Sequence, residues 1–185
     1  MATMRIPCGA ERGFSLVELM LVVAFAATLL TIAVPVMTDV SDSSKLNSAA
    51  REIERELQSA RLKSVSSNRL LRVRLNCPGT GMYRTVEYVA SPAVDDATNR
   101  CSDSAYPFPA DSDVMTRPNF DGPVRLLPLG ATVTSNILQF QPDGTAVTLV
   151  SNVVTPITVP ITITVTRKGK SKAITVNGAG KIQLQ

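Results

Sequence analysis

The feature that most constrains the fold is an uncharged apolar run near the N-terminus. Residues 19–37 are nineteen positions without a charged side chain, and their only polar members are Thr28 and Thr31, whose hydroxyls can bond back to a helix. Extended back to Phe14, the run has twenty-four residues and one charge, Glu18. A helix of this length, at about 1.5 Å per residue, can cross the roughly 30 Å hydrocarbon core of a bilayer. The sequence therefore predicts a transmembrane helix over residues 14–37.

Two other interpretations of this run deserve comparison. A secretory signal peptide has an apolar segment of about 7–15 residues followed by an Ala-x-Ala-like site. This run is longer, and no such site follows it. The remaining alternative is a helix buried in a core. Arg5 and Arg12 precede the run, which itself has no basic residue, so we expect the N-terminus in the cytoplasm and the later residues outside.

The composition argues against an enzyme. The 185 residues include no histidine and no tryptophan. Without histidine, the chain lacks the commonest general base and metal ligand, which excludes Ser-His-Asp and Cys-His hydrolases and His-containing zinc sites. Only 4% of the residues are aromatic, so base-stacking platforms are not expected, and the net charge of +4 does not by itself indicate a nucleic-acid-binding protein. We expect no catalytic residues, no metal and no cofactor.

The junction before the apolar run carries the most specific motif. From Gly13 it reads Gly-Phe-Ser-Leu-Val-Glu-Leu. A glutamate in an apolar span costs a few kcal/mol if it stays ionised and unpaired. No other side chain of the span can pair with Glu18. Cleavage after Gly13 would create an α-amine at Phe14, which could neutralise Glu18 of a neighbouring subunit.

This motif, followed by an apolar helix, resembles the prepilin motif of type IV pilins and type II secretion pseudopilins. The resemblance implies that residues 1–13 are a leader removed by a prepilin peptidase and that Phe14 becomes the N-methylated first residue. Glu18 matches the glutamate used in assembly, and Pro35 matches the proline that commonly interrupts this helix. The implied function is that of a minor pilin or pseudopilin, a structural subunit of a type II secretion pseudopilus or type IV pilus. Its partners would be other pilin or pseudopilin subunits and an inner-membrane assembly platform, with the head in the periplasm.

An amphipathic continuation is expected over residues 38–68. From Lys45 to about Asn68, apolar or small residues recur at spacings of three and four, which predicts a helix with one buried face. The charged residues on its other faces are most simply interpreted as solvated. The buried face comprises Leu46, Ala50, Ile53, Leu57 and Ala60, and the charged set comprises Arg51, Glu52, Arg55, Glu56 and Arg61.

Residues 69–185 read as a β-rich head. Strands are expected at residues 71–75, 82–90, 124–127, 137–140, 146–150, 157–165, 173–176 and 182–184, with a proline-rich excursion over residues 91–122. The late strands are expected to form an antiparallel meander, with Pro160 at an edge or a break. A long helix followed only by strands predicts an α+β fold. By the resemblance this is a pilin-like fold, with a long N-terminal helix packed on an antiparallel β-sheet.

The last third of the chain carries a second resemblance. Residues 138–146 read Leu-Gln-Phe-Gln-Pro-Asp-Gly-Thr-Ala, and a late hairpin leads to a terminal strand that begins Gly180-Lys181-Ile182. This arrangement is similar to the head of GspH/FimT-type minor pilins.

Cysteines and carboxylates outside the helix give weaker signals. Removal of the leader would also remove Cys8 and leave Cys77 and Cys101, an even pair that suggests a disulfide in an exported domain, with two free thiols as the alternative. The acidic residues of the excursion lack the spacing of a calcium loop and are interpreted as solvated. They are Asp95, Asp96, Asp111 and Asp113.

Two basic groups suggest an alternative function. One lies at a late turn and the next strand, and comprises Arg167, Lys168, Lys170, Lys172 and Lys181. The other lies on the first hairpin, and comprises Arg69, Arg72, Arg74 and Arg84. Clustered cations could neutralise DNA phosphates, as in minor pilins that take up DNA in natural transformation. Gly180-Lys181-Ile182-Gln183 departs from the Gly-Arg-x-Arg of such proteins, and a solvated turn is the simpler interpretation.

Overall fold

The computed structural model describes residues 13, 15–109, 120–134, 137–150 and 153–185. The chain divides into two compact units, with the division between Ser41 and Asp42. Helix α1, Leu16–Ser67, runs through this division as 52 consecutive helical residues. The helix continues into residues 38–67 as expected, and it also continues through Pro35, where the resemblance implies an interruption.

In the first unit, the helix exposes its apolar side chains. Every residue of 16–40 whose side chain is described is exposed. The hydroxyls of Thr28 and Thr31 donate to the carbonyl oxygens of Phe25 and Thr28, at 2.8 and 2.7 Å, which removes two polar groups from the helix surface. Among the described residues, α1 is the one helix with the length and apolar composition to cross a membrane.

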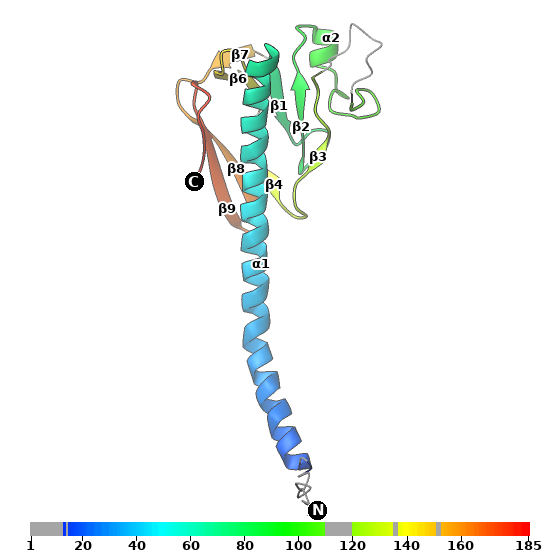
Figure 1. Ribbon diagram of the computed structural model, residues 1–185, viewed down its shortest axis with the longest axis vertical. Coiled ribbons are helices and arrows are strands. Elements are labelled where there is room, and N and C mark those ends of the chain that lie inside the picture. Colours follow the sequence, from blue (N-terminus) through cyan, green and yellow to red (C-terminus); the bar gives the residue numbers. More distant parts are fainter. Residues whose placement is uncertain (1–12, 14, 110–119, 135–136, 151–152) are drawn as a thin grey trace, which may run out of the picture. The chain divides into compact units, whose positions relative to one another are not determined.

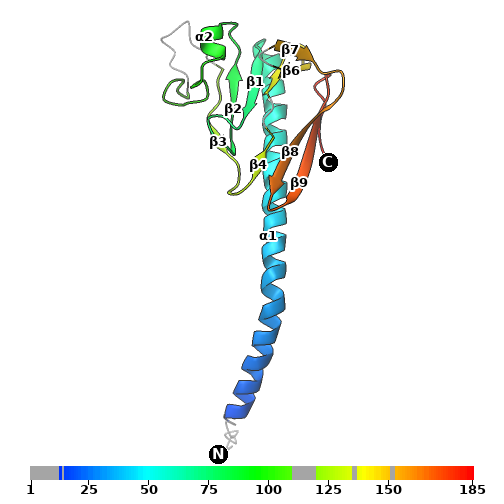
Figure 2. The same ribbon diagram turned by 180° about the vertical axis from the view of Figure 1, so that it is seen from behind.

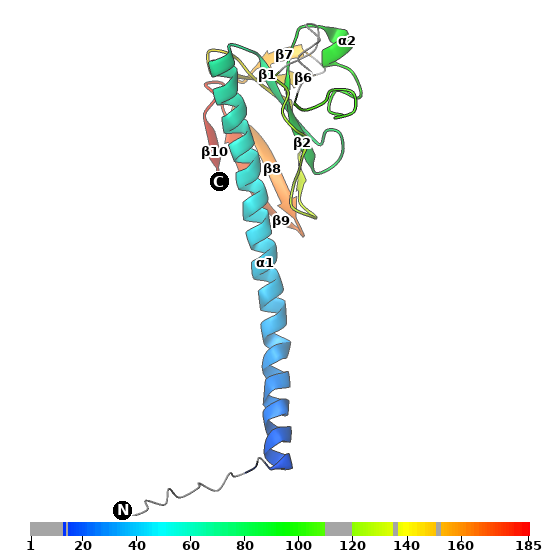
Figure 3. The ribbon, with the colours of Figure 1, turned by 45° about the vertical axis from the view of Figure 1, so that its right-hand side comes forward.

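The second unit packs the rest of α1 against two antiparallel sheets. The sheets lie on one side of the helix, which is in front of them in Figure 1 and behind them in Figure 2. Helix residues of the expected apolar face are buried together with residues from both sheets. Figure 3 shows the helix and the sheets turned by 45° from the view of Figure 1. The spacing of three and four therefore predicted this face correctly. Its buried members are Leu46, Ala49, Ala50, Ile53, Leu57 and Ala60.

The first sheet has six strands in the order β3-β2-β1-β5-β6-β7. Its strands are β1 Leu71–Leu75, β2 Met82–Glu87, β3 Arg125–Leu126, β5 Ile137–Phe140, β6 Ala146–Val150 and β7 Val153–Pro156. The second sheet has four strands in the order β10-β9-β8-β4. Its strands are β4 Thr132–Val133, β8 Ile161–Arg167, β9 Lys170–Val176 and β10 Ile182–Leu184.

The α+β prediction is confirmed, and the late strands β8, β9 and β10 form the expected antiparallel meander. The chain leaves the first sheet after Pro156 and enters the second at Ile161, so the first four residues of the expected strand over residues 157–165 lie outside both sheets. Pro160 lies in the break, where its missing N–H removes no ladder hydrogen bond. Strand β8 then pairs with β9 on one side and with β4 on the other.

The charged side of the helix is less solvated than expected. Glu52 accepts a hydrogen bond from the Tyr83 hydroxyl at 2.6 Å, and Glu56 accepts one from the Thr85 hydroxyl at 2.5 Å. Arg61 donates to two turn carbonyls. The interpretation of these three residues as a solvated face is therefore wrong, because strand β2 carries partners for the two glutamates and two turns carry the partners of Arg61.

Candidate functional site

The predicted assembly elements lie at the start of α1. Gly13 is described, whereas Phe14 and residues 1–12 lie outside the described residues, so cleavage and methylation remain predictions. Glu18 lies in the first turn of α1 with an exposed side chain. It forms no hydrogen bond or ion pair with any residue that the structure describes. A partner for this carboxylate must therefore come from outside that part of the chain.

The apolar surface around Glu18 is extensive. Leu16, Leu29 and Met37 have exposed fractions of 70%, 69% and 76%. Apolar side chains are exposed along about 30 Å of this helix. They need lipid or protein neighbours, because contact of apolar surface with water costs free energy. This segment thus has the chemistry of a membrane anchor and of a helix–helix contact surface.

The late basic turn is anchored to the helix. Arg167 is 8% exposed, and its Nη2 and Nε lie 3.0 and 3.3 Å from Oδ1 of Asp42. The Lys168 ammonium lies 2.7 Å from Oδ2 of the same carboxylate. These contacts, with the Lys168 hydrogen bond as the largest cause, hold the pKa of Asp42 below its usual value. Arg167 is therefore a buried structural cation, and the prediction of an exposed DNA contact at this residue is wrong.

The remaining late cations do not form one cluster. Lys170 begins β9, whereas Lys181 precedes Ile182, which pairs with Val176 at the other end of that strand. Six residues of strand separate the two ends by about 20 Å. Lys168, Lys170 and Lys181 are exposed, and Lys172 is half-buried. DNA binding remains an untested prediction, with fewer neighbouring cations than the sequence suggests.

The early basic group is mostly interior. Arg72 and Arg84 are buried, so their assignment to an exposed basic patch is wrong. Arg72 lies 3.9 Å from the centre of the Tyr88 ring and donates to Gln139. Arg84 donates to the carbonyl oxygens of Gly122 and Tyr106. Arg69 alone of the four is exposed.

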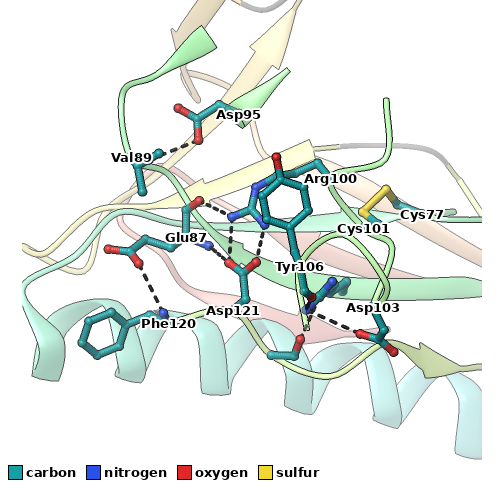
Figure 4. A network of polar contacts seen from close by, with 12 residues as sticks. Cys77, Glu87, Val89, Asp95, Arg100, Cys101, Asp103, Tyr106, Phe120 and Asp121 are labelled. Atoms are coloured by element: carbon teal, nitrogen blue, oxygen red, sulfur yellow. Dashed lines mark hydrogen bonds and ion pairs between the residues drawn. A yellow bond between two sulfur atoms is a disulfide. The ribbon is translucent and has the colours of Figure 1, made fainter. Parts of the chain in front are cut away.

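The proline-rich excursion is organised by a buried ion pair that sequence analysis missed. Arg100, fully buried, binds both carboxylate oxygens of Asp121 and donates to the Glu87 carbonyl oxygen at 2.8 Å (Figure 4). Asp121 also accepts the Glu87 backbone N–H at 2.7 Å. The Tyr106 ring covers the guanidinium at 4.6 Å. No local pattern indicated this pair, because its partners are twenty-one residues apart.

Acidic residues of the excursion differ in role. Asp95 lies in the short helix α2, Pro92–Asp95, and is buried, so its interpretation as a solvated acid is wrong. Its two oxygens accept the backbone N–H groups of Val89 and Ser91 at 3.1 and 2.9 Å. Asp96 is exposed as expected, and Asp111 and Asp113 lie outside the described residues. Among the described residues, no group of three or more His, Cys, Asp or Glu side chains could hold a metal.

The predicted disulfide is confirmed. Cys77 follows β1 and bonds to Cys101 of the excursion, with the two Cα atoms 5.6 Å apart (Figure 4). The bond fixes the excursion to the first hairpin next to Arg100. This covalent link and the ion pair hold a segment whose described residues form one short helix, α2, and no strand before β3.

The two motifs of the last third of the chain meet at one point. Arg61 of α1 donates from Nε to the Gly144 carbonyl oxygen at 2.8 Å and from Nη2 to that of Ala179 at 3.2 Å. Gly180 has φ +73°, and a Cβ there would overlap the Gly144 carbonyl oxygen and lie 2.6 Å from Arg61 Nε. One arginine therefore joins the helix to the Pro-Asp-Gly turn and to the turn before the last strand.

The chain is similar to several known proteins. Residues 49–180 match the family described as Type II transport protein GspH. The type IV minor pilin FimU of Pseudomonas aeruginosa has a TM-score of 0.48 and 18% identity, covering 78% of this chain and 91% of FimU. The minor pseudopilin EpsH of the Vibrio cholerae type 2 secretion system has a TM-score of 0.45 and 12% identity, covering 76% and 96%. No curated protein gives a significant match. Because the family match spans most of the chain, the protein belongs to the GspH family of type II transport proteins.

Proposed function

We propose that this protein is a minor pilin or pseudopilin, a structural subunit of a type II secretion pseudopilus or a type IV pilus. The observation that carries the proposal is the exposed apolar run of α1 over residues 16–37, in which Glu18 is the one carboxylate, on a chain of the GspH family. In this proposal, a prepilin peptidase cleaves after Gly13, the new terminus at Phe14 is methylated, and an inner-membrane platform inserts the subunit into the filament. The head then lies on the periplasmic side.

Assembly is driven by compensation of two charges. The cleaved terminus carries an α-amine at Phe14, and Glu18 has no partner among the described residues. When subunits stack, the amine of one subunit approaches Glu18 of its neighbour, and both charges become compensated in a low-dielectric environment. Removing one partner of such a desolvated pair typically costs about 3–5 kcal/mol. The pairing therefore gives assembly a direction and a register.

The test is incorporation of tagged variants into sheared or cross-linked filaments. We expect Glu18→Ala to insert and be cleaved but to enter filaments poorly, with Glu18→Asp intermediate because its side chain is shorter. Glu54→Ala is the matched control, since Glu54 lies on the same helix and has no partner among the described residues. Normal incorporation of Glu18→Ala would contradict the pairing. Mass spectrometry of the membrane form separately tests for a chain that begins at N-methyl-Phe14.

A further inference from the structure

An arginine on the outer face of the six-stranded sheet has no ion-pair partner among the residues that the structure describes. Along β1, Leu71, Val73 and Leu75 alternate with Arg72 and Arg74, so the two arginines project from the face opposite the helix. Arg74 is half-buried and forms no hydrogen bond or ion pair with any described residue. Its Nη1 is buried without a partner. The Arg74 guanidinium therefore has N–H donors that are partly shielded from water and have no acceptor among the described residues.

The neighbours of Arg74 increase the positive charge. Arg84 stands directly opposite Arg74 on β2, and its Nη1 is also buried without a partner. Arg100 reaches the same region from the excursion, with a buried and unpartnered Nε. Burial lowers the pKa of Arg74, and the charges of Arg100 and Arg72 lower it further, while Asp96 and Asp95 act in the opposite direction. Each of the three guanidinium groups thus has one buried nitrogen without a hydrogen-bond partner among the described residues.

The nearby carboxylates are already engaged or distant. Asp121 binds Arg100 through both of its oxygens, and Asp95 accepts two backbone N–H groups. Asp103 is 57% exposed and lies 3.5 Å from Arg84, a contact too open to serve a second arginine. Unpaired buried charge is costly, and proteins ordinarily compensate it. Asp96 and Asp95 act on Arg74 electrostatically, but no described residue forms an ion pair or a hydrogen bond with its guanidinium.

We propose that half-buried Arg74 binds an oxyanion group on the outer face of the six-stranded sheet, while the fully buried Arg84 and Arg100 add positive charge behind it without contacting the group. The planar guanidinium fork matches two oxygens of a carboxylate or of a phosphate. The group can come from an acidic side chain of a neighbouring protein or from a free phosphate-type anion. This site is separate from the Glu18 assembly element and does not depend on the function proposed above.

The test is thermal unfolding of the full-length protein in detergent. Tyrosine fluorescence reports on the second unit, because all three tyrosines lie there, at positions 83, 88 and 106. Inorganic phosphate is compared with chloride at equal ionic strength. We expect a saturable rise in Tm of about 3–6 °C at ten times the dissociation constant. Arg74→Met should abolish the rise, and in chloride it should melt no lower than the natural chain, since it removes an unpaired cation.

Matched variants separate a site from a general charge effect. Arg51→Met removes one exposed, unpartnered cation from α1 and should keep the full phosphate response. Arg74→Lys keeps the charge but not the fork and should respond more weakly. Acetate distinguishes the sources: a response equal to that of phosphate indicates a protein carboxylate, and a response to phosphate alone indicates a free anion.

The proposal is overturned if phosphate has no effect on the natural chain or the same effect on Arg74→Met. A chain with both Asp111→Asn and Asp113→Asn is measured in parallel, because these carboxyls lie outside the described residues. A phosphate response that appears only in this double variant would also overturn the proposal, since the site would then be filled from within the chain.

Discussion

Replacement of Gly180 by alanine should destabilise the second unit more than any ordinary glycine substitution in a turn. The new Cβ would overlap the Gly144 carbonyl oxygen, which is a backbone atom, and would lie 2.6 Å from Nε of Arg61. To relieve these contacts, the turn must move away from the helix. The movement breaks the 2.8 Å hydrogen bond from Arg61 to Gly144.

The magnitude follows from two separate costs. Alanine at a left-handed φ of +73° costs about 1–2 kcal/mol in backbone energy. Loss of a hydrogen bond from a charged donor costs about 1.5–3 kcal/mol more. Gly169 gives the matched control, because it has φ +77° and nothing within 4 Å of a Cβ. Gly169→Ala should therefore show the backbone cost alone, about 1–2 kcal/mol, against about 3–5 kcal/mol for Gly180→Ala.

Urea unfolding followed by tyrosine fluorescence measures both variants in the full-length protein in detergent. The difference between their free energies of unfolding isolates the contact at Arg61. Equal losses for Gly180→Ala and Gly169→Ala would refute the reasoning, because the turn would then accept a Cβ without disturbing the helix. The variant Arg61→Met should remove most of the difference between the two, since the hydrogen bond is then already absent.

Three further perturbations test the second unit. Cys77→Ser or Cys101→Ser opens a link across twenty-four residues and should lower the free energy of unfolding by about 3–4 kcal/mol, read from the urea midpoint. Tyr83→Phe should cost about 1–3 kcal/mol through the lost bond to Glu52. Burial, with Glu52 next, raises the pKa of Tyr83 well above 10, so its contribution is complete below pH 10 and is lost as the pH rises beyond it. Asp42→Asn should remove stability that is present above pH 3.8 and lost at lower pH, because the pKa of Asp42 is lowered in the folded state.

Each of these has a control in the same unit. Reductant should lower the stability of the natural chain to that of the cysteine variants and leave those variants unchanged. Tyr106→Phe removes a hydroxyl that forms no hydrogen bond with any described residue, and should keep the alkaline loss that Tyr83→Phe removes. Asp96→Asn removes an exposed carboxylate and should lose stability at low pH to the same extent as the natural chain. A free energy of unfolding that falls more steeply at low pH in Asp42→Asn than in the natural chain would contradict the role assigned to the Asp42 contacts.

Local periodicity accounts for what could be predicted about the fold. The spacing of Leu46, Ala50, Ile53 and Leu57 marked the buried face of α1 because a helix repeats every 3.6 residues. Alternation of apolar and polar residues marked the strands, because successive side chains of a strand point to opposite faces of the sheet. The division into two sheets could not be found this way, because it depends on which strands pair. The β1–β5 and β4–β8 pairings join residues more than thirty positions apart, and alternation carries no information about them.

The candidate site shows a sharper limit. Cys77 and Cys101 could be paired because they are the two cysteines that remain once the leader with Cys8 is removed. Glu18 stood out because it is the one charged residue of an apolar run. The polar helix residues could not be assigned from their own sequence, since the partner of Glu52 is a tyrosine hydroxyl thirty-one residues later. Charged side chains were interpreted as solvated wherever no local partner was visible. That interpretation fails when the partner comes from another element.

The arginines carry this limit into the function. Arg72, Arg84, Arg100 and Arg167 are all buried, each held by carbonyl, amide, carboxylate or ring contacts within the second unit. Their charge cannot contact a polyanion at the surface, so charge counted along the sequence overstates the field that DNA would meet. Arg74 differs because it is half-buried and has no counter-ion among the described residues. The buried arginines therefore do not supply a basic face for a nucleic acid, and Arg74 is the one for which we propose an oxyanion partner.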